Sequence, residues 1–143
     1  MSDASSPQDA GPPATILFVE DEALIRMDMA EFLRECGYRV HEASDASEAL
    51  EALQAKFAID LVFTDVNFPR GMTGVELADW VLTNRAGAKV IVTTGRGVPT
   101  ALAPKVGKML PKPYTGRDLH ARVRQALSSP QEAPGDGGIP PSG

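Results

Sequence analysis

The sequence predicts an α/β domain built on a doubly wound, five-stranded parallel sheet. Short β-branched apolar runs alternate with segments of helical periodicity, which is the pattern of a parallel sheet with crossover helices. The length of 143 residues, with 43% apolar and 23% charged residues, suits one globular core. Acidic residues directly follow the first and third apolar runs, at the sheet edge where such folds bind ligands. The predicted strands are TILFV, YRVHE, IDLVFT, KVIVT and KML.

Composition changes at both ends of the chain. Residues 1–13 are poor in apolar side chains, and eight of the last 14 residues are Pro or Gly. Such segments cannot bury enough apolar surface to offset the entropy of ordering. We therefore expect disordered tails at 1–13 and 130–143 and a folded domain over 14–129.

One apolar stripe predicts the first helix and the face that packs on the sheet. Gly37 follows the stripe as a helix stop, because glycine readily adopts the left-handed conformation that ends a helix. The sole cysteine belongs to this stripe, so we expect a buried thiol and no internal disulfide. At spacing i, i+4, i+7, i+8 and i+11, the stripe consists of Ile25, Met29, Phe32, Leu33 and Cys36.

The second and third helices are predicted from capping and periodicity. Asp45, with Glu48 three residues later, resembles a capping box and opens a helix that continues to Phe57. In the third helix, apolar residues within 75–82 fill one arc. This arc leaves Trp80 on the opposite side, where we expect it to be exposed.

The C-terminal third contains one regular helix and one irregular segment. Apolar residues spaced by four predict a last helix that begins at Thr115 or Gly116. Between the fourth and fifth strands, Pro104 would remove a hydrogen bond from any helix begun at Pro99. We therefore expect a short or irregular fourth helix there.

Charge and hydropathy exclude several classes of partner. The net charge is −5 and Lys and Arg form no cluster, so the chain lacks the basic surface that nucleic acid or an anionic membrane requires. The N-terminal stretch resembles no signal peptide, and no apolar run is long enough to cross a bilayer. We expect a cytoplasmic protein that binds neither nucleic acid nor membrane.

Carboxylates gather at the predicted ligand-binding edge. With the strand order 2-1-3-4-5, the order reverses between the first and third strands, and ligands bind there. The first strand delivers Glu20, Asp21 and Glu22, and the third delivers Asp65. Crowded carboxylates raise at least one pKa unless a cation compensates their charge. Mg²⁺ suits this set because it is hard, prefers oxygen and takes one or two carboxylates together with water and phosphate oxygens.

Two further polar groups arrive at the same edge. Thr94 closes the fourth strand, and Lys112, between two prolines, closes the fifth. A carboxylate nucleophile, a metal ion that neutralises charge, a hydroxyl and an ammonium together suit the transfer of a phosphoryl group onto an acid. The residues therefore indicate the transfer of a phosphoryl group onto a carboxylate at this edge.

The motifs FVEDE, FTDVNFP, VTTG and PKPY occur in this order at the predicted strand ends. Together they resemble the receiver domain of two-component response regulators, a CheY-like variant of the flavodoxin-like fold. Each motif alone is weak, but four in register on the right elements are specific. The resemblance covers nearly all of the folded region and suggests a bacterial, stand-alone receiver.

The resemblance implies a role for each matching residue at the metal site. Asp21 would be the direct carboxylate ligand of Mg²⁺, with Glu20 assisting through water. Asp65 and the backbone carbonyl of Asn67 would complete the protein ligands. Glu22 matches no ligand and is expected to begin the first helix, where its charge meets the positive end of the helix dipole.

The resemblance also implies how the phosphoryl group is held. Asp65 would be the phosphoacceptor, Thr94 the switch residue that moves toward it, and Lys112 the ion-pair partner. Pro113 would fit a cis bond after Lys112. Met109 departs from the family, which commonly has Tyr or Phe at this position, so the usual coupling of hydroxyl and aromatic ring is altered.

This resemblance implies a signalling function rather than that of a conventional enzyme. The domain would accept a phosphoryl group from a sensor histidine kinase or a histidine phosphotransfer protein, and would then lose it by autodephosphorylation. With no output domain expected in the chain, signalling would pass through contacts with a downstream protein, with a phosphorylation-dependent homodimer as one form.

Three alternatives remain open from the residues. A receiver fold that no longer uses phosphate could act as a constitutive binding module. A flavin- or nucleotide-binding module would need a turn rich in Gly or Ser/Thr after the first strand, where this chain has three acids. A phosphatase of the haloacid dehalogenase type would carry its nucleophile after the first strand rather than the third.

Overall fold

The computed structural model describes residues 12–55, 58–68, 71–85, 87–94 and 108–128. Its five strands are β1 (Thr15–Val19), β2 (Arg39–Ala43), β3 (Leu61–Asp65), β4 (Lys89–Thr94) and β5 (Lys108–Pro111). They form one sheet in the order β2-β1-β3-β4-β5, and all neighbouring pairs are parallel. The predicted fold class and strand order are confirmed.

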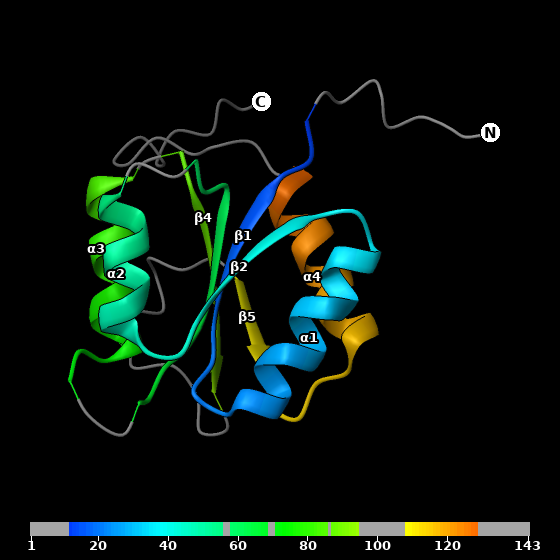
Figure 1. Cartoon of the computed structure of the whole chain (residues 1–143), viewed down its shortest axis with the longest axis horizontal. Coiled ribbons are helices and arrows are strands. Elements are labelled where there is room, and N and C mark those ends of the chain that lie inside the picture. The colour runs from blue at the N-terminus through cyan, green and yellow to red at the C-terminus, as the bar shows by residue number, and fades with distance from the viewer. Residues whose placement is uncertain (1–11, 56–57, 69–70, 86, 95–107, 129–143) are drawn as a thin grey trace, which may run out of the picture.

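Helices cover both faces of the sheet. They are α1 (Ala23–Glu35), α2 (Ala46–Gln54), α3 (Gly74–Asn84) and α4 (Gly116–Ser128). Figure 1 shows α2 and α3 on one face, with α1 and α4 on the other. This is the doubly wound, three-layer arrangement that results when crossover helices pack on both faces of a parallel sheet.

Two hydrophobic cores form because side chains along β1 alternate between the faces of the sheet. Leu17 and Val19 enter the core beneath α2 and α3, and Ile16 and Phe18 enter the core beneath α1 and α4. All four side chains are fully buried. In the second core the rings of Phe18 and Phe63 stack with centroids 4.6 Å apart. These buried central strands hold the carboxyl ends of β1 and β3 next to each other.

The helix ends follow the predicted caps, with one difference. Gly37 ends α1 with a φ of +106°, as its position predicted. At α2 the Asp45 carboxylate accepts a hydrogen bond from the Glu48 N–H at 2.8 Å. The Glu48 carboxylate, however, accepts from the Ser44 N–H rather than from that of Asp45, so the reciprocal half of the box is shifted by one residue. Complete reciprocal capping pairs are present at α3, between Thr73 and Glu76, and at α4, between Thr115 and Asp118.

Three predictions about exposure are wrong. The thiol of Cys36 was expected to be buried, but this residue is only partly buried. Ile25 was expected on the buried stripe of α1, but it is 41% exposed. It belongs to the first turn of α1, beside the loop after β1, and periodicity does not show where the sheet beneath a helix ends. Trp80 was expected to be exposed, but it is half-buried and packs against the core beneath α2 and α3. A large indole reaches the core from the border of an apolar arc.

Several expectations concern residues outside the described ranges. They are the irregular fourth helix, the extension of the second helix to Phe57, and both tails, so the domain boundaries at 14 and 129 stay predictions. Within the described ranges, no helix has the length and apolar character that crossing a membrane requires.

The first residue of α3 lies against the backbone that carries Asp65. A Cβ added at Gly74 would lie 1.6 Å from the carbonyl oxygen of Asp65 and 2.9 Å from the Cα of Val66. We predict that Gly74→Ala lowers the free energy of unfolding by about 3 kcal/mol, because the helix must move away from the strand. Urea unfolding measures this change.

Gly87→Ala is the matched control, because a Cβ there would meet nothing within 4 Å. Its unfolding midpoint should equal or exceed that of the wild type. Similar midpoints for the two variants would contradict the close approach of α3 to β3.

Candidate functional site

Three carboxylates meet at the carboxyl edge of the sheet. Glu20 and Asp21 follow β1, and Asp65 ends β3, the neighbouring strand. One oxygen of each can be chosen so that all three lie within 4.8 Å of one another. Glu20 and Asp65 are buried, with exposures of 2% and 6%, whereas Asp21 is exposed. The sequence predicted this meeting of acids from the strand order alone.

Backbone hydrogen bonds hold the residues that carry these acids. The Glu20 N–H donates to the Ala43 carbonyl at 3.0 Å, which ties the end of β1 to β2. The Val66 N–H donates to the Thr93 carbonyl at 3.0 Å, and the Gly74 N–H donates to the Val66 carbonyl at 2.8 Å. Asp65 is therefore presented from a backbone fixed both to β4 and to the start of α3.

Glu20 is the most constrained of the three acids. Its carboxylate accepts a hydrogen bond from the Glu22 N–H at 3.0 Å. Burial raises the pKa of the Glu20 carboxyl, and the negative charges of Asp65 and Asp21 add to that effect. The hydrogen bond from Glu22 and the positive charge of Lys112 oppose it. The positive charge of Lys112 therefore does not fully compensate the ionised carboxylate of Glu20.

Lys112 supplies the cation at this site. Its Nζ lies 2.6 Å from Oδ2 of Asp65, a charge-assisted hydrogen bond between β3 and the residue after β5. Burial alone would lower the pKa of Lys112, but the bond to Asp65 and the charges of Asp65, Glu20 and Asp21 together raise it. The ammonium is therefore protonated at neutral pH. The peptide bond from Lys112 to Pro113 is cis, as the PKPY motif predicted.

Thr94 and Asn67 complete the set of residues predicted from sequence. Thr94 ends β4 and is buried, one residue beyond Thr93, the β4 partner of Asp65. Asn67 is exposed, and its N–H donates to Oδ1 of Asp65 at 3.3 Å. The structure thus brings every predicted site residue to one edge of the sheet.

Two residues at this edge were not singled out from the sequence. Arg26 donates from Nη1 to the backbone carbonyl of Glu20 at 2.9 Å. In the sequence, Arg26 looks like an ordinary surface residue of the first helix, and nothing there indicates its contact with Glu20. Tyr114 has a buried hydroxyl for which the described residues offer no hydrogen-bond partner, and burial with the charges of Glu20 and Asp65 raises its pKa. Its place in the PKPY motif was its only signal.

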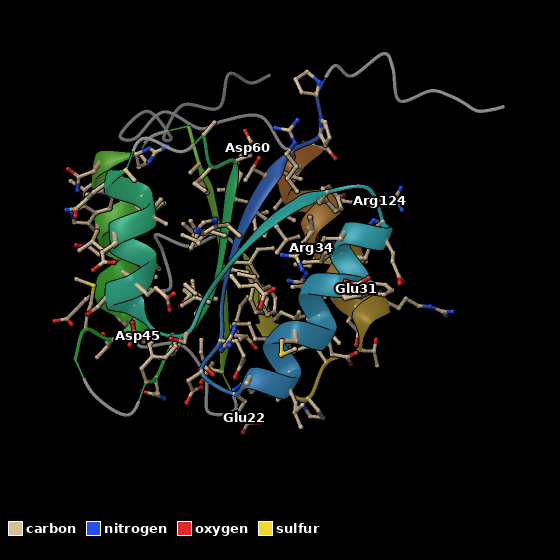
Figure 2. The ribbon with its side chains drawn as sticks, in the orientation of Figure 1. Glu22, Glu31, Arg34, Asp45, Asp60 and Arg124 are labelled. Carbon is tan, nitrogen blue, oxygen red and sulfur yellow. The ribbon has the colours of Figure 1, made fainter. Side chains whose placement is uncertain are left out.

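Figure 2 shows how charges are distributed between the two edges of the sheet. Glu22, at the start of α1, and Asp45, at the start of α2, lie at the carboxyl edge, whereas Asp60, before β3, lies at the opposite edge. Acids thus occur at both edges of the sheet, and Glu20, Asp21 and Asp65 belong to the carboxyl edge. They gather where parallel strands end and helices begin, which is where this fold binds ligands.

The donor set fits a hard divalent cation. Three carboxylates and one ammonium leave a formal charge of −2 when all are ionised. The oxygens lie close together at the sheet edge, and one acid is exposed, so solvent can supply the remaining ligands. Mg²⁺ prefers such a site, with one or two carboxylates and several waters.

Comparison with known proteins agrees with this geometry. The family model described as the response regulator receiver domain matches residues 16–124. The transcriptional regulatory protein PdtaR of Mycobacterium tuberculosis is 38% identical over 131 residues, which are 90% of this chain and 63% of PdtaR. The sensor kinase CckA of Brucella abortus is 34% identical over 127 residues, which are 83% of this chain and 13% of CckA. The chain thus spans less than two thirds of the length of each relative.

A solved structure shows the same architecture. The CheY-like response regulator receiver domain protein from Methanospirillum hungatei JF-1 matches with a TM-score of 0.74 and 28% identity, covering 81% of this chain and 94% of that one. The family match spans the strands that carry Glu20, Asp65 and Lys112. By its sequence, its strand order and the residues at its sheet edge, the chain belongs to the response regulator receiver domains of two-component systems.

Proposed function

We propose that this receiver accepts a phosphoryl group on Asp65, with Mg²⁺ bound by Asp21, Glu20, Asp65 and the carbonyl of Asn67. The observation that carries the proposal is the contact of 2.6 Å between Lys112 and Asp65 inside the acidic cluster. An ion pair with only structural work to do would not require two further carboxylates within 4.8 Å.

The reaction is a transfer from phosphohistidine to carboxylate. An oxygen of Asp65 attacks the phosphorus, the new O–P bond forms as the N–P bond breaks, and the histidine ring nitrogen leaves. When bound, Mg²⁺ supplies positive charge that offsets the phosphoryl oxygens and the acids around them. The chain itself holds Asp65 on a fixed backbone and keeps a protonated lysine against it.

Lys112 and Thr94 are the groups that hold the product. Lys112 already lies against Asp65 and would contact the phosphoryl oxygens once the transfer is complete. Thr94, at the end of β4, would bring its hydroxyl to the same group. A phosphoryl group that draws both side chains inward biases the domain toward a second packing, which is the physical form of the switch.

The surface beside the acidic cluster supports a protein as the donor. Leu24, Ile25 and Met27 are 81%, 41% and 55% exposed in the first turns of α1, the helix that follows Glu20 and Asp21. A donor histidine must reach Asp65, so the protein that carries it covers this edge. An apolar surface there suits a sensor histidine kinase or a histidine phosphotransfer protein, and the similarity to CckA supports such a partner. A cytoplasmic location, typical of the family, is part of the proposal.

The first prediction concerns the acceptor. Incubation with acetyl phosphate should add one phosphoryl group to the wild type in the presence of Mg²⁺ and far less in its absence. Asp65→Asn should remain unmodified, because the amide lacks the nucleophilic oxygen. Intact mass spectrometry measures the gain.

A receiver of known activity serves as the positive control. If that control is modified while this chain is not, the chain is a receiver fold that no longer uses phosphate and acts as a binding module. Modification of Asp65→Asn to the level of the wild type would place the acceptor elsewhere.

A second prediction concerns the buried acid. The raised pKa of Glu20 means that the folded state binds its proton more tightly than the unfolded state, so this group lowers stability as the pH rises above 4.5. Without Mg²⁺ at pH 7, Glu20→Gln should therefore unfold at higher urea concentration than the wild type. The difference should shrink toward pH 4.

The same variant should lose affinity for Mg²⁺ by about tenfold, because the amide carries no charge. Titration calorimetry measures that loss. Gln at this position should still accept the hydrogen bond from the Glu22 N–H, which keeps the loop intact. Unchanged stability together with unchanged affinity would remove Glu20 from the site.

A third prediction concerns the donor surface. Leu24→Ser should leave the free energy of unfolding within about 0.5 kcal/mol of the wild type, because the side chain is 81% exposed. Acetyl phosphate should modify the variant at the wild-type rate. Transfer from a histidine kinase that phosphorylates the wild type should be slower by about tenfold, since one apolar contact is lost. Equal transfer rates would exclude this surface from the complex.

A further inference from the structure

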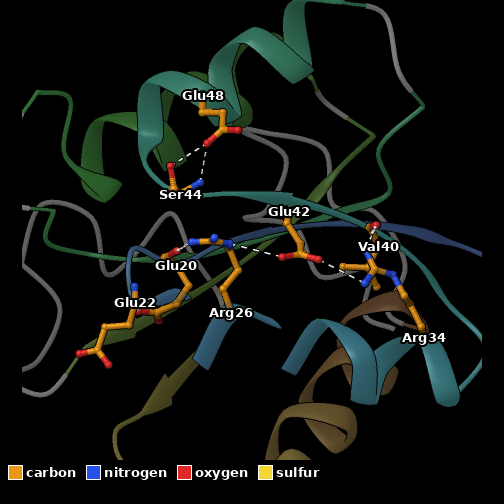
Figure 3. Close-up of polar contacts among 8 residues, drawn as sticks. All are labelled: Glu20, Glu22, Arg26, Arg34, Val40, Glu42, Ser44 and Glu48. Atoms are coloured by element: carbon orange, nitrogen blue, oxygen red, sulfur yellow. Dashed lines mark hydrogen bonds and ion pairs between the residues drawn. The ribbon is translucent and has the colours of Figure 1, made fainter. Parts of the chain in front are cut away.

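One arginine connects the acidic cluster to the neighbouring strand. From the first turns of α1, Arg26 donates from Nη1 to the backbone carbonyl of Glu20 at 2.9 Å and from Nε to the Glu42 carboxylate at 3.4 Å. Figure 3 shows its guanidinium between the two glutamates, one in the loop after β1 and the other on β2. The Arg26 side chain is 18% exposed. Its position is therefore set on both sides by protein groups.

Glu42 is itself held by a second arginine of α1. Its other carboxylate oxygen lies 3.2 Å from Nη1 of Arg34, and Arg34 also donates to the Val40 carbonyl at 2.8 Å. Figure 3 shows these contacts as one continuous series from the backbone carbonyl of Val40, through Arg34, Glu42 and Arg26, to the backbone carbonyl of Glu20. Arg26 and Arg34 share the partner Glu42, but of the two arginines only Arg26 contacts Glu20.

We infer that Arg26 is a positioning residue for the cation site, anchored by Glu42 and acting through the backbone of Glu20. The inference rests on the proposed function, because it assigns Arg26 a part in binding Mg²⁺. The Glu20 carbonyl belongs to the peptide that joins Glu20 to Asp21, the two acids that β1 contributes to the cluster. A donor fixed on that carbonyl limits rotation of the peptide and keeps both carboxylates aimed toward Asp65.

The geometry requires an arginine. A planar guanidinium presents Nε and Nη1 in a fixed relation, so the carboxylate of Glu42 sets the direction in which Nη1 meets the Glu20 carbonyl. A lysine carries one ammonium on a flexible chain and cannot fix both contacts at once. The Arg26 N–H donates to the Glu22 carbonyl at 2.9 Å as the first backbone hydrogen bond of α1, a bond that lysine at this position would keep.

The charge of Arg26 and its positioning of Glu20 have opposite effects on the affinity for Mg²⁺, so the two effects can be measured separately. A positive charge beside the acids repels Mg²⁺, so its removal alone would strengthen binding of the ion. If the Glu20–Asp21 peptide is no longer held in position, Mg²⁺ binding weakens, because the two carboxylates must then be ordered at a cost in entropy when the ion binds. Arg26→Lys keeps the charge and removes the fixed geometry, and it therefore reports position alone.

The test is the affinity for Mg²⁺ of Arg26→Lys, with Arg34→Lys as the matched control on the same helix and the same partner. Titration calorimetry on the full chain should show about a tenfold weaker affinity for Arg26→Lys. Arg34→Lys should bind Mg²⁺ like the wild type. Glu42→Gln, which weakens the anchor of Arg26, should fall between the two.

A second measurement needs no metal. The Glu22 N–H donates to the Glu20 carboxylate, so amide hydrogen exchange at Glu22 reports the order of this loop in Mg²⁺-free protein. Exchange at Glu22 should be faster in Arg26→Lys than in Arg34→Lys, after correction for unfolding free energies measured in urea. If Arg26→Lys fails to fold, Glu42→Gln provides both readouts.

The outcomes distinguish this inference from the function on which it rests. A wild type that binds no Mg²⁺ would overturn the proposed function and the inference with it. A wild type that binds Mg²⁺, with equal affinities for Arg26→Lys and Arg34→Lys, would overturn the inference alone. Equal losses in the two variants would also overturn it, because Arg34 has no recorded contact with Glu20.

Discussion

The ion pair between Lys112 and Asp65 joins the ends of two strands that are not neighbours in the sheet. Asp65 ends β3 and Lys112 follows β5, with β4 between them. The two side chains meet at 2.6 Å because parallel strands end at one edge, so residues distant in sequence share a site there. The pair compensates one of three crowded carboxylates and leaves the charge of the others for a cation. The electrostatics and the proposed chemistry of the site both depend on parallel strands that end at this common edge.

The site carries a cost in stability that the rest of the domain offsets. A buried Glu20 with a raised pKa and a Tyr114 hydroxyl without a partner among the described residues both oppose folding. The two cores on either side of the sheet, with their stacked aromatic pair, supply the stabilising contacts. Because the cost falls at the sheet edge and the gain in the interior, the domain can keep a site whose formal charge of −2 is not balanced by the residues of the site themselves.

Backbone contacts tie the described residues after β1 and β3 to their neighbours. The start of α3 lies so close to Asp65 that only glycine fits at position 74, and hydrogen bonds tie the residues after β1 and β3 to their neighbours. A phosphoryl acceptor held in this way needs little reorganisation for attack on phosphorus. Among the described residues at this edge, the side chains of Lys112 and Thr94 are the groups that we propose respond to a phosphoryl group.

The sequence by itself determined the order of the elements, the class of sheet and the acids at its edge. Those features follow from local patterns: alternation of apolar runs, turn residues such as Gly37, and acids placed directly after strands. Only the tertiary structure decided the exposure of Ile25, the partial burial of Trp80, the shift of the Glu48 hydrogen bond to Ser44, and the contact of Arg26 with the Glu20 carbonyl. Each of these depends on the position and rotamer of a side chain in three dimensions, which leaves no periodic signal along the chain.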